Sequence, residues 1–187
     1  YEEFLVRYDG EHVEWVDGEV VEMSPVTPEH ADIVAFLISL LRIVTEARAQ
    51  GSVLGEPFHM KTAPHLPGRS PDVIFVAAAR GEAITWRCLA GPANLAVEVI
   101  SPDSVHRDRV EKFAEYEEGG VEEYWVIDPE ARRADFYQRN AEGRYQAVPA
   151  DTDGVYRSRE LPGFWLRVEW LWARPPVLSA LRELGVL

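Results

Sequence analysis

An apolar strand with one acid inside it places the strongest constraint on the fold of this chain. The segment Leu95–Ile100 is a strand-like run of six residues in which Glu98 is the one ionisable side chain. A second acid, Asp72, begins another strand-like segment directly after Pro71. An ionised carboxylate among apolar side chains is costly unless a positive charge neutralises it. The fold must therefore bring a cation to Glu98, either a metal ion shared with Asp72 or a basic side chain.

The length and composition of the chain fit a single domain. The 187 residues are 47% hydrophobic and 27% charged, which is typical of a globular protein with a substantial core. No apolar run approaches the roughly 20 residues that a membrane-spanning helix needs, and no signal peptide opens the chain. The single cysteine, Cys88, cannot form an internal disulfide. We therefore expect one domain over residues 1–187, no membrane partner and a location in the reducing cytoplasm.

The charge of the chain argues against a surface that attracts polyanions over long distances. Acidic residues number 32 and basic residues 19, which gives a net charge of −13. Proteins that bind nucleic acid usually carry a basic surface, because phosphate contacts dominate their affinity. Arginines cluster at Arg107 and Arg109 and at Arg132 and Arg133. These clusters either line a cleft or lie on a solvated helix face and in a turn.

Two elements are marked clearly near the start of the sequence. Asp17-Gly18 separates two alternating runs, which predicts a type I′ β-hairpin over residues 13–23. A helical stripe of apolar residues follows, with Thr27 as the expected N-cap and Pro28 as the first helical residue. Gly51 lies beyond the end of this helix. The pattern places His30 in the first helical turn.

The later elements predict a sheet covered by helices. Strands are expected around residues 53–60, 73–76, 95–100, 123–127 and 134–138 and near residue 145. A second helix is expected over residues 104–118, ended by Gly119-Gly120, and a short one around residues 177–184. This order predicts an α/β (α+β) fold, in which helices flank one central mixed sheet and a β-hairpin lies at the N-terminus.

The two strand carboxylates suggest chemistry with a hard metal ion. Mg²⁺ and Mn²⁺ prefer oxygen ligands, and carboxylates on neighbouring strands can converge on one ion. Such an ion polarises a phosphate and makes a bound water nucleophilic near neutral pH. Two alternatives remain open. Asp72 after Pro71 also fits a turn or strand cap, and Glu98 also fits one half of a buried ion pair.

Lys112 is the basic residue that could join the two acids. It lies on the helix that follows the strand of Glu98, and such a helix can bring a long side chain to the end of that strand. There its ammonium could stabilise phosphate charge or position a water. Tyr116, four residues later, shares the same helix face. Taken alone, Lys112 also fits a solvated surface charge.

Several motifs together resemble one family. They are Asp17–Glu19, Glu22–Pro25, His30, Pro71–Val73, Val97–Pro102, Asp108 with Lys112 and Tyr116, Gly120–Pro129 and Leu161–Phe164. This combination is similar to the Uma-two family of restriction endonuclease-like domains, within the PD-(D/E)XK nuclease superfamily. The similarity runs from about Tyr8 to about Glu169.

The resemblance implies a restriction-endonuclease-like fold with a metal site at one end of the sheet. It implies that Asp72 and Glu98 are metal ligands and that the carbonyl of Val99 is a further one. The superfamily's usual lysine stands two residues after the glutamate, where this chain has Ile100. The catalytic lysine is therefore expected on the helix, at Lys112.

The resemblance also nominates supporting residues. By similarity to viral cap-snatching nucleases, His30 could be a metal ligand that favours Mn²⁺, although packing or capping remains open. Asp108 and Tyr116 accompany Lys112 in the motif. An outer carboxylate could come from Glu19, Glu22 or Glu29, and the sequence does not choose among them.

The functional expectation is a Mg²⁺- or Mn²⁺-dependent nuclease that hydrolyses phosphodiester bonds of nucleic acid, with DNA as the expected substrate, through attack by water. Two alternatives stay open. One is a nuclease fold kept as a binding or regulatory module without turnover, and the other is a metal-dependent hydrolase of a small phosphoester. The sequence leaves the oligomeric state open, a homo-oligomer included.

Overall fold

The centre of the fold is a six-stranded mixed sheet. The computed structural model describes residues 1–187. In the order β11-β10-β9-β8-β6-β3, the strands are Tyr145–Ala147, Arg133–Arg139, Glu123–Asp128, Leu95–Val99, Val73–Ala77 and Gly51–Gly55. Strands β8 and β9 pair in parallel, and the other neighbours pair antiparallel. The predicted mixed sheet is confirmed.

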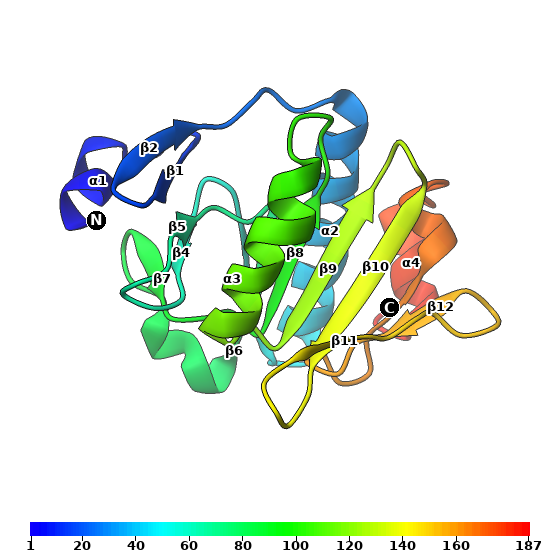
Figure 1. The fold of residues 1–187 in the computed structure, drawn as a ribbon. Helices are drawn as coiled ribbons and strands as arrows, with labels where there is room; N and C mark the ends of the chain where they lie inside the picture. Colours follow the sequence, from blue (N-terminus) through cyan, green and yellow to red (C-terminus); the bar gives the residue numbers. More distant parts are fainter.

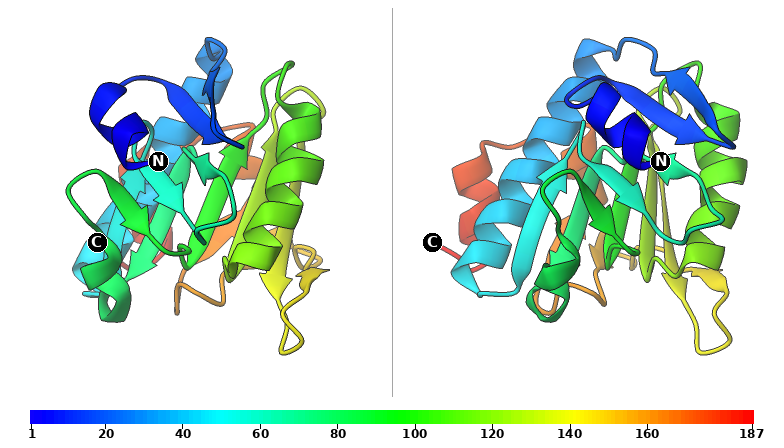
Figure 2. Two further views of the ribbon diagram at one scale, coloured as in Figure 1. Left: turned by 60° about the vertical axis from the view of Figure 1, so that its left-hand side comes forward. Right: turned by 90° about the vertical axis from the view of Figure 1, so that its left-hand side faces the viewer.

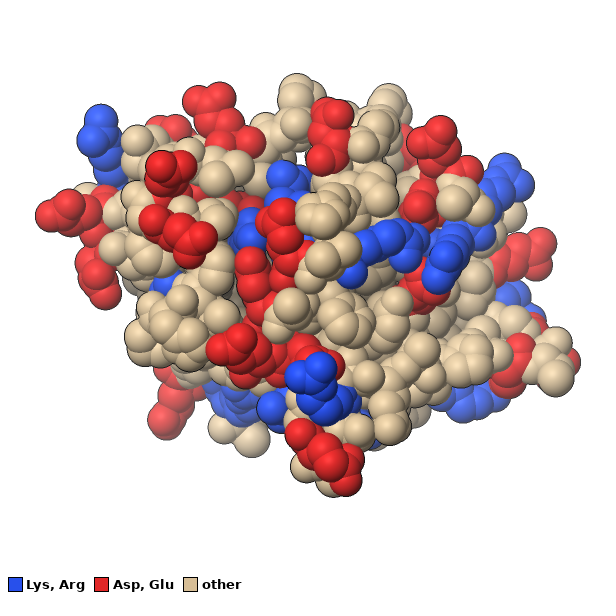
Figure 3. Space-filling view, in the orientation of Figure 1, with Lys and Arg blue, Asp and Glu red and all other residues tan.

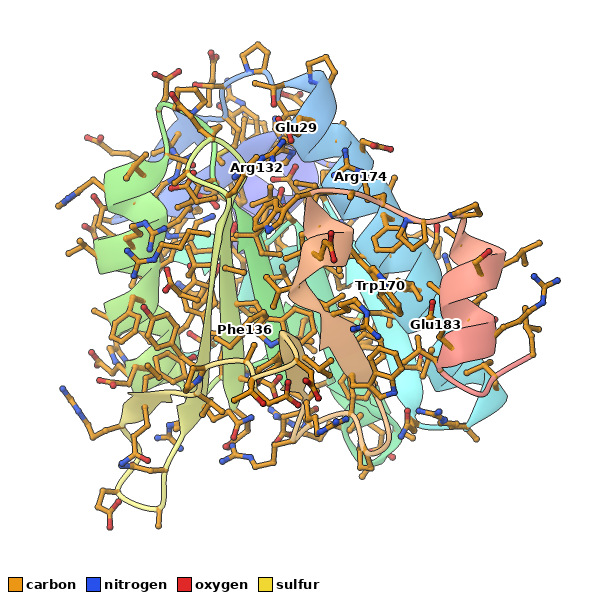
Figure 4. All side chains as sticks on the ribbon, turned by 90° about the vertical axis from the view of Figure 1, so that its right-hand side faces the viewer. Glu29, Arg132, Phe136, Trp170, Arg174 and Glu183 are labelled. Carbon is orange, nitrogen blue, oxygen red and sulfur yellow. The ribbon has the colours of Figure 1, made fainter.

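Helices cover both faces of this sheet. Helices α2 (Pro28–Ala47) and α4 (Val177–Glu183) lie on one face, and α3 (Lys112–Gly119) lies on the other (Figures 1 and 2). The larger apolar core lies between α2, α4 and the sheet, and it includes Phe136 and Trp170 (Figure 4). A smaller core lies on the α3 side. The predicted arrangement of a mixed sheet flanked by helices is therefore confirmed.

Alternation along β8 decides which way Glu98 faces. Val97 and Val99 belong to the core on the α2 side, whereas Ala96 belongs to the core on the α3 side. Because successive side chains of a strand point to opposite faces, Glu98 lies on the α3 face with Ala96. It therefore faces the helix that carries Lys112.

A second sheet lies beside α3, which the sequence did not predict. Its order is β2-β1-β5-β4-β7, with strands Glu19–Glu22, Val13–Val16, Gly68–Arg69, His59–Lys61 and Cys88–Ala90, and α1 (Glu2–Arg7) lies against it (Figure 1). The remaining elements are the 3₁₀ turns η1 (Ala78–Ala83) and η3 (Val168–Leu171) and the paired strands β12 (Val155–Arg157) and β13 (Trp165–Arg167).

One predicted strand was wrong. The expected strand over residues 53–60 is two strands in different sheets, since β3 ends at Gly55 and β4 begins at His59. Glu56-Pro57 separates them. Proline has no N–H to donate to a strand ladder, so Pro57 interrupts the ladder between the two segments.

The predicted turn of the N-terminal hairpin and the predicted N-cap of α2 are confirmed. Asp17 and Gly18 have φ of 50° and 88°, as a type I′ turn requires. The side chain of Thr27 accepts a hydrogen bond from the backbone N–H of His30 at 3.2 Å and caps α2. None of the helices combines the length and apolar character that a membrane crossing requires.

The second helix contains an unpredicted π-helical turn, η2 (Arg107–Glu111), directly before α3. Gly120 ends α3 with a φ of 84°, as its sequence position predicted. π-Helical turns are rare and are frequently found at functional sites. Both η2 and the start of α3 contribute to the pocket described next.

Candidate active site

Asp72, Glu98 and Lys112 line one small pocket at the end of the central sheet. Val73 of β6 lies opposite Val97 of the antiparallel β8, so the start of β6 lies beside the end of β8. This register brings Asp72 next to Glu98. The cavity has a volume of about 20 Å³, which is room for about one water molecule or small ion.

Lys112 is a buried cation surrounded by carboxylates. Its side chain is 1% exposed, and its Nζ lies 2.9 Å from Glu98 Oε2 and 3.3 Å from both Glu14 Oε1 and Asp108 Oδ1. Burial alone would lower the pKa of Lys112, but the charges of Glu14, Glu98 and Asp108 raise it well above its usual value. The residue is therefore an ammonium ion and not a candidate base.

Glu98 is held by two donors. Its Oε2 pairs with Lys112, and its Oε1 accepts a hydrogen bond from the hydroxyl of Tyr116 at 2.8 Å. Burial raises the pKa of Glu98 well above its usual value, Lys112 opposes this, and the negative charges of Asp108 and Asp72 add to it. The ion pair with Lys112 therefore does not offset the cost of burying this carboxyl group.

Asp72 is oriented by Val99 and His30. Its Oδ2 accepts a hydrogen bond from the backbone N–H of Val99 at 2.6 Å, and its Oδ1 lies 3.2 Å from His30 Nε2. Burial would lower the pKa of His30, but Asp72, Glu56 and the backbone of Val99 together raise it. A protonated imidazole stabilises Asp72, whereas metal ligation would require the neutral form.

Two carboxylates that were not predicted from the sequence also belong to this site. Glu14 of β1 is fully buried, contacts Lys112, and pairs with Arg69 Nη1 at 2.8 Å. Burial would raise the pKa of Glu14, but Lys112 and Arg69 lower it to about 2. Glu56 lines the pocket and accepts from His12 Nε2 at 2.6 Å. Burial and the charge of Asp72 raise the pKa of Glu56.

The structure does not bring Glu22 to the pocket. Glu22 belongs to β2, an edge strand of the second sheet, where it lies opposite Val13 of β1. Its side chain is exposed to solvent. Glu19 and Glu29 are exposed as well. Glu29 lies at the start of α2, at the same end of the molecule as Arg132 (Figure 4). The acids near Asp72 and Glu98 are instead Glu14, Glu56 and Asp108.

The side chains at this site are of the types that bind a hard divalent cation. Carboxylates and an imidazole are ligands that Mg²⁺ and Mn²⁺ accept. Asp108 Oδ1 is buried and makes no hydrogen bond, although Lys112 Nζ lies 3.3 Å from it. No group of three or more His, Cys, Asp or Glu side chains is arranged to hold a metal ion. Tyr116 and Lys112 engage the oxygens of Glu98, while Val99 and His30 engage those of Asp72.

A mixed sheet between helices, with buried acids and a lysine at one end of the sheet, defines an α/β protein with a restriction-endonuclease-like arrangement. Residues 1–169 match the Uma2 family, described as "Putative restriction endonuclease", and the chain belongs to that family. The family resemblance of the sequence motifs is confirmed.

A solved structure has the same fold. The chain is similar to the crystal structure of a putative nuclease belonging to DUF820 from Anabaena variabilis ATCC 29413, with a TM-score of 0.70 and 14% sequence identity. The similarity covers 86% of this chain and 89% of that one. No curated protein matches the chain.

Proposed function

We propose that this chain is a metal-dependent nuclease that hydrolyses phosphodiester bonds of nucleic acid, with DNA as the expected substrate. One observation carries the proposal: Asp72, Glu98 and Lys112 line a single buried pocket in a member of the Uma2 family. Clustered carboxylates attract a divalent cation, and a fixed ammonium favours a phosphate group.

Each residue has a distinct role in this proposal. Asp72 and Glu98 would hold Mg²⁺ or Mn²⁺, with the carbonyl of Val99 as a further donor. His30 would have to lose its proton and its contact with Asp72 before it could join them. Such an ion, when bound, polarises a phosphate and acidifies a water. Lys112 stabilises negative charge on the phosphate, because its raised pKa keeps it cationic.

The other side chains act by positioning. Tyr116 fixes one oxygen of Glu98 through its hydroxyl, and Glu14 and Asp108 hold the Lys112 ammonium between them. His30 restrains Asp72 from the first turn of α2. Side chains fixed in this way lose little entropy when substrate binds.

Two specific observations favour the alternatives. The net charge of −13 is better tolerated by a hydrolase of small phosphoesters than by a nuclease. The pairing of Glu98 with Lys112 neutralises much of the acid's charge without a metal, as a non-catalytic module would require. The following assay separates all three functions.

The test is nicking of supercoiled plasmid with Mn²⁺ or Mg²⁺. The parent protein should nick the plasmid, Asp72→Asn should not, and the control Glu22→Gln should remain active because Glu22 lies outside the pocket. Equal cleavage by the parent and Asp72→Asn would contradict the proposal. Turnover of bis(p-nitrophenyl) phosphate without nicking would favour the small-phosphoester hydrolase. Absence of both activities would favour the regulatory module.

A further inference from the structure

One arginine in the pocket has a buried donor that lacks a hydrogen-bond partner. Arg107, the first residue of η2, lines the same cavity as Asp72 and Lys112. Its Nε is buried and has no hydrogen-bond partner. The carboxylate oxygen with which it pairs by charge, Asp108 Oδ1, lies 3.9 Å away, which is too far for a hydrogen bond. A buried donor left unsatisfied is costly, so a missing acceptor is indicated.

The other basic side chains of the pocket already have acidic partners. Lys112 contacts three carboxylates, His30 lies 3.2 Å from Asp72, and His12 lies 2.6 Å from Glu56. Arg107 therefore carries the pocket's unassigned positive charge. Its side chain is 20% exposed, so a ligand at the mouth of the pocket could reach it.

Arg109 lies on the same turn as Arg107, but its guanidinium is paired with carboxylates of the chain. Its guanidinium lies 2.7 Å from Asp135 and 3.4 Å from Asp128, so its charge is neutralised within the chain. On the face that carries α3, basic side chains lie beside acidic ones at the right, whereas acidic side chains prevail at the left (Figure 3). The lack of such a partner distinguishes Arg107 from Arg109.

We propose that Arg107 binds a backbone phosphate of the nucleic-acid strand at the mouth of the pocket. This inference rests on the proposed nuclease function and names a residue that recognises its substrate. A guanidinium presents a planar fork of donors that matches two phosphate oxygens. Bound phosphate would supply the acceptor that the Nε of Arg107 lacks.

The shape of the site fits a strand that lies across its mouth. A cavity of about 20 Å³ has no room for a base or sugar, so the strand must stay outside. The adjoining pocket of about 490 Å³ is lined by Glu29 and Glu130, whose charges repel phosphate. Arg107 is therefore the favourable position for the backbone next to the acids.

Fluorescence anisotropy with a short labelled DNA duplex and the matching single strand tests this. Ca²⁺ replaces the active ion, and binding is measured at several salt concentrations. We expect Arg107→Ala to weaken binding about tenfold at low salt and to reduce the slope of log K against log salt by about one. Arg107→Lys should keep the slope but bind more weakly, because it loses the fork. The control Arg182→Ala, a change at an exposed arginine of α4 on the opposite face of the sheet, should match the parent.

The failures of this inference and of the proposed function are distinguishable. If the parent binds and Arg107→Ala has the same affinity and salt slope, Arg107 is not the phosphate ligand, while the nuclease proposal stands. If the parent binds neither strand form, both ideas are overturned. Thermal melts establish that each variant is folded, and Arg107→Gln, which keeps the bulk of the side chain, decides the question if Arg107→Ala does not fold.

Discussion

At the scale of single residues, the charge balance of the pocket depends on Lys112. Its ammonium lies within 3.3 Å of oxygens from Glu14, Glu98 and Asp108. Removal of one carboxylate leaves the ammonium with two others. Removal of the ammonium leaves three buried acids without that counter-charge, and one of them, Glu98, already has a raised pKa.

Lys112→Met should therefore destabilise the metal-free protein by roughly 3–5 kcal/mol, the usual cost of breaking a buried ion pair. Glu98→Gln should cost clearly less, because it also relieves repulsion from Asp72 and Asp108. Chemical denaturation at neutral pH measures both. If Glu98→Gln loses as much stability as Lys112→Met, Glu98 is one half of a structural ion pair.

At the scale of elements, the second sheet holds the helix that carries Lys112. Arg69 of β5 joins Glu14 of β1 to Glu115 of α3, with distances of 2.8 and 2.6 Å. Glu14 in turn contacts Lys112. The sheet formed around the N-terminal hairpin thus fixes the position of α3 relative to the pocket through buried charges.

This link predicts a pH dependence for Glu14. Its pKa is lowered from 4.5 to about 2, since Lys112 and Arg69 outweigh the effect of burial. A lowered carboxyl pKa stabilises the folded state above pH 4.5, and this contribution is lost as the pH falls toward about 2. The difference in free energy of unfolding between the parent and Glu14→Gln should therefore be large at neutral pH and shrink on acidification.

Denaturant titrations across this pH range measure the effect. Glu19→Gln, a change at an exposed acid on the same hairpin, is the control and should differ little from the parent. If the difference in free energy of unfolding between the parent and Glu14→Gln stays constant with pH, the role given to the Glu14 carboxylate is contradicted.

Sequence patterns revealed part of the site because alternation carries burial information. An acid within an apolar strand singled out Glu98, and the same reasoning applied to Val13–Val16 would have found Glu14. Glu56 lies in the connection between two sheets, and its approach to Asp72 depends on the tertiary fold. Strands β5 and β7 have two and three residues, which is too short for a periodic pattern.

At the scale of the whole molecule, the acidic charge limits how nucleic acid can bind. The net charge is −13, and several arginines, including Arg69 and Arg109, are paired with acids inside the chain. Phosphate contacts must then be few and local. With about three phosphates neutralised, log K against log salt should have a slope of roughly −3 on duplex DNA. A much steeper slope in anisotropy measurements would reveal a basic binding face outside the pocket.

The central claim, that the acids of the pocket hold a divalent cation, is tested most directly by isothermal titration of the metal-free protein with Mn²⁺. The parent should bind Mn²⁺ with release of protons, because the pKa of Glu98 is raised before the ion enters. Asp72→Asn and Glu98→Gln should lose this binding, while Glu22→Gln should keep it. Absence of binding by the parent, or equal binding by all four proteins, would contradict the claim.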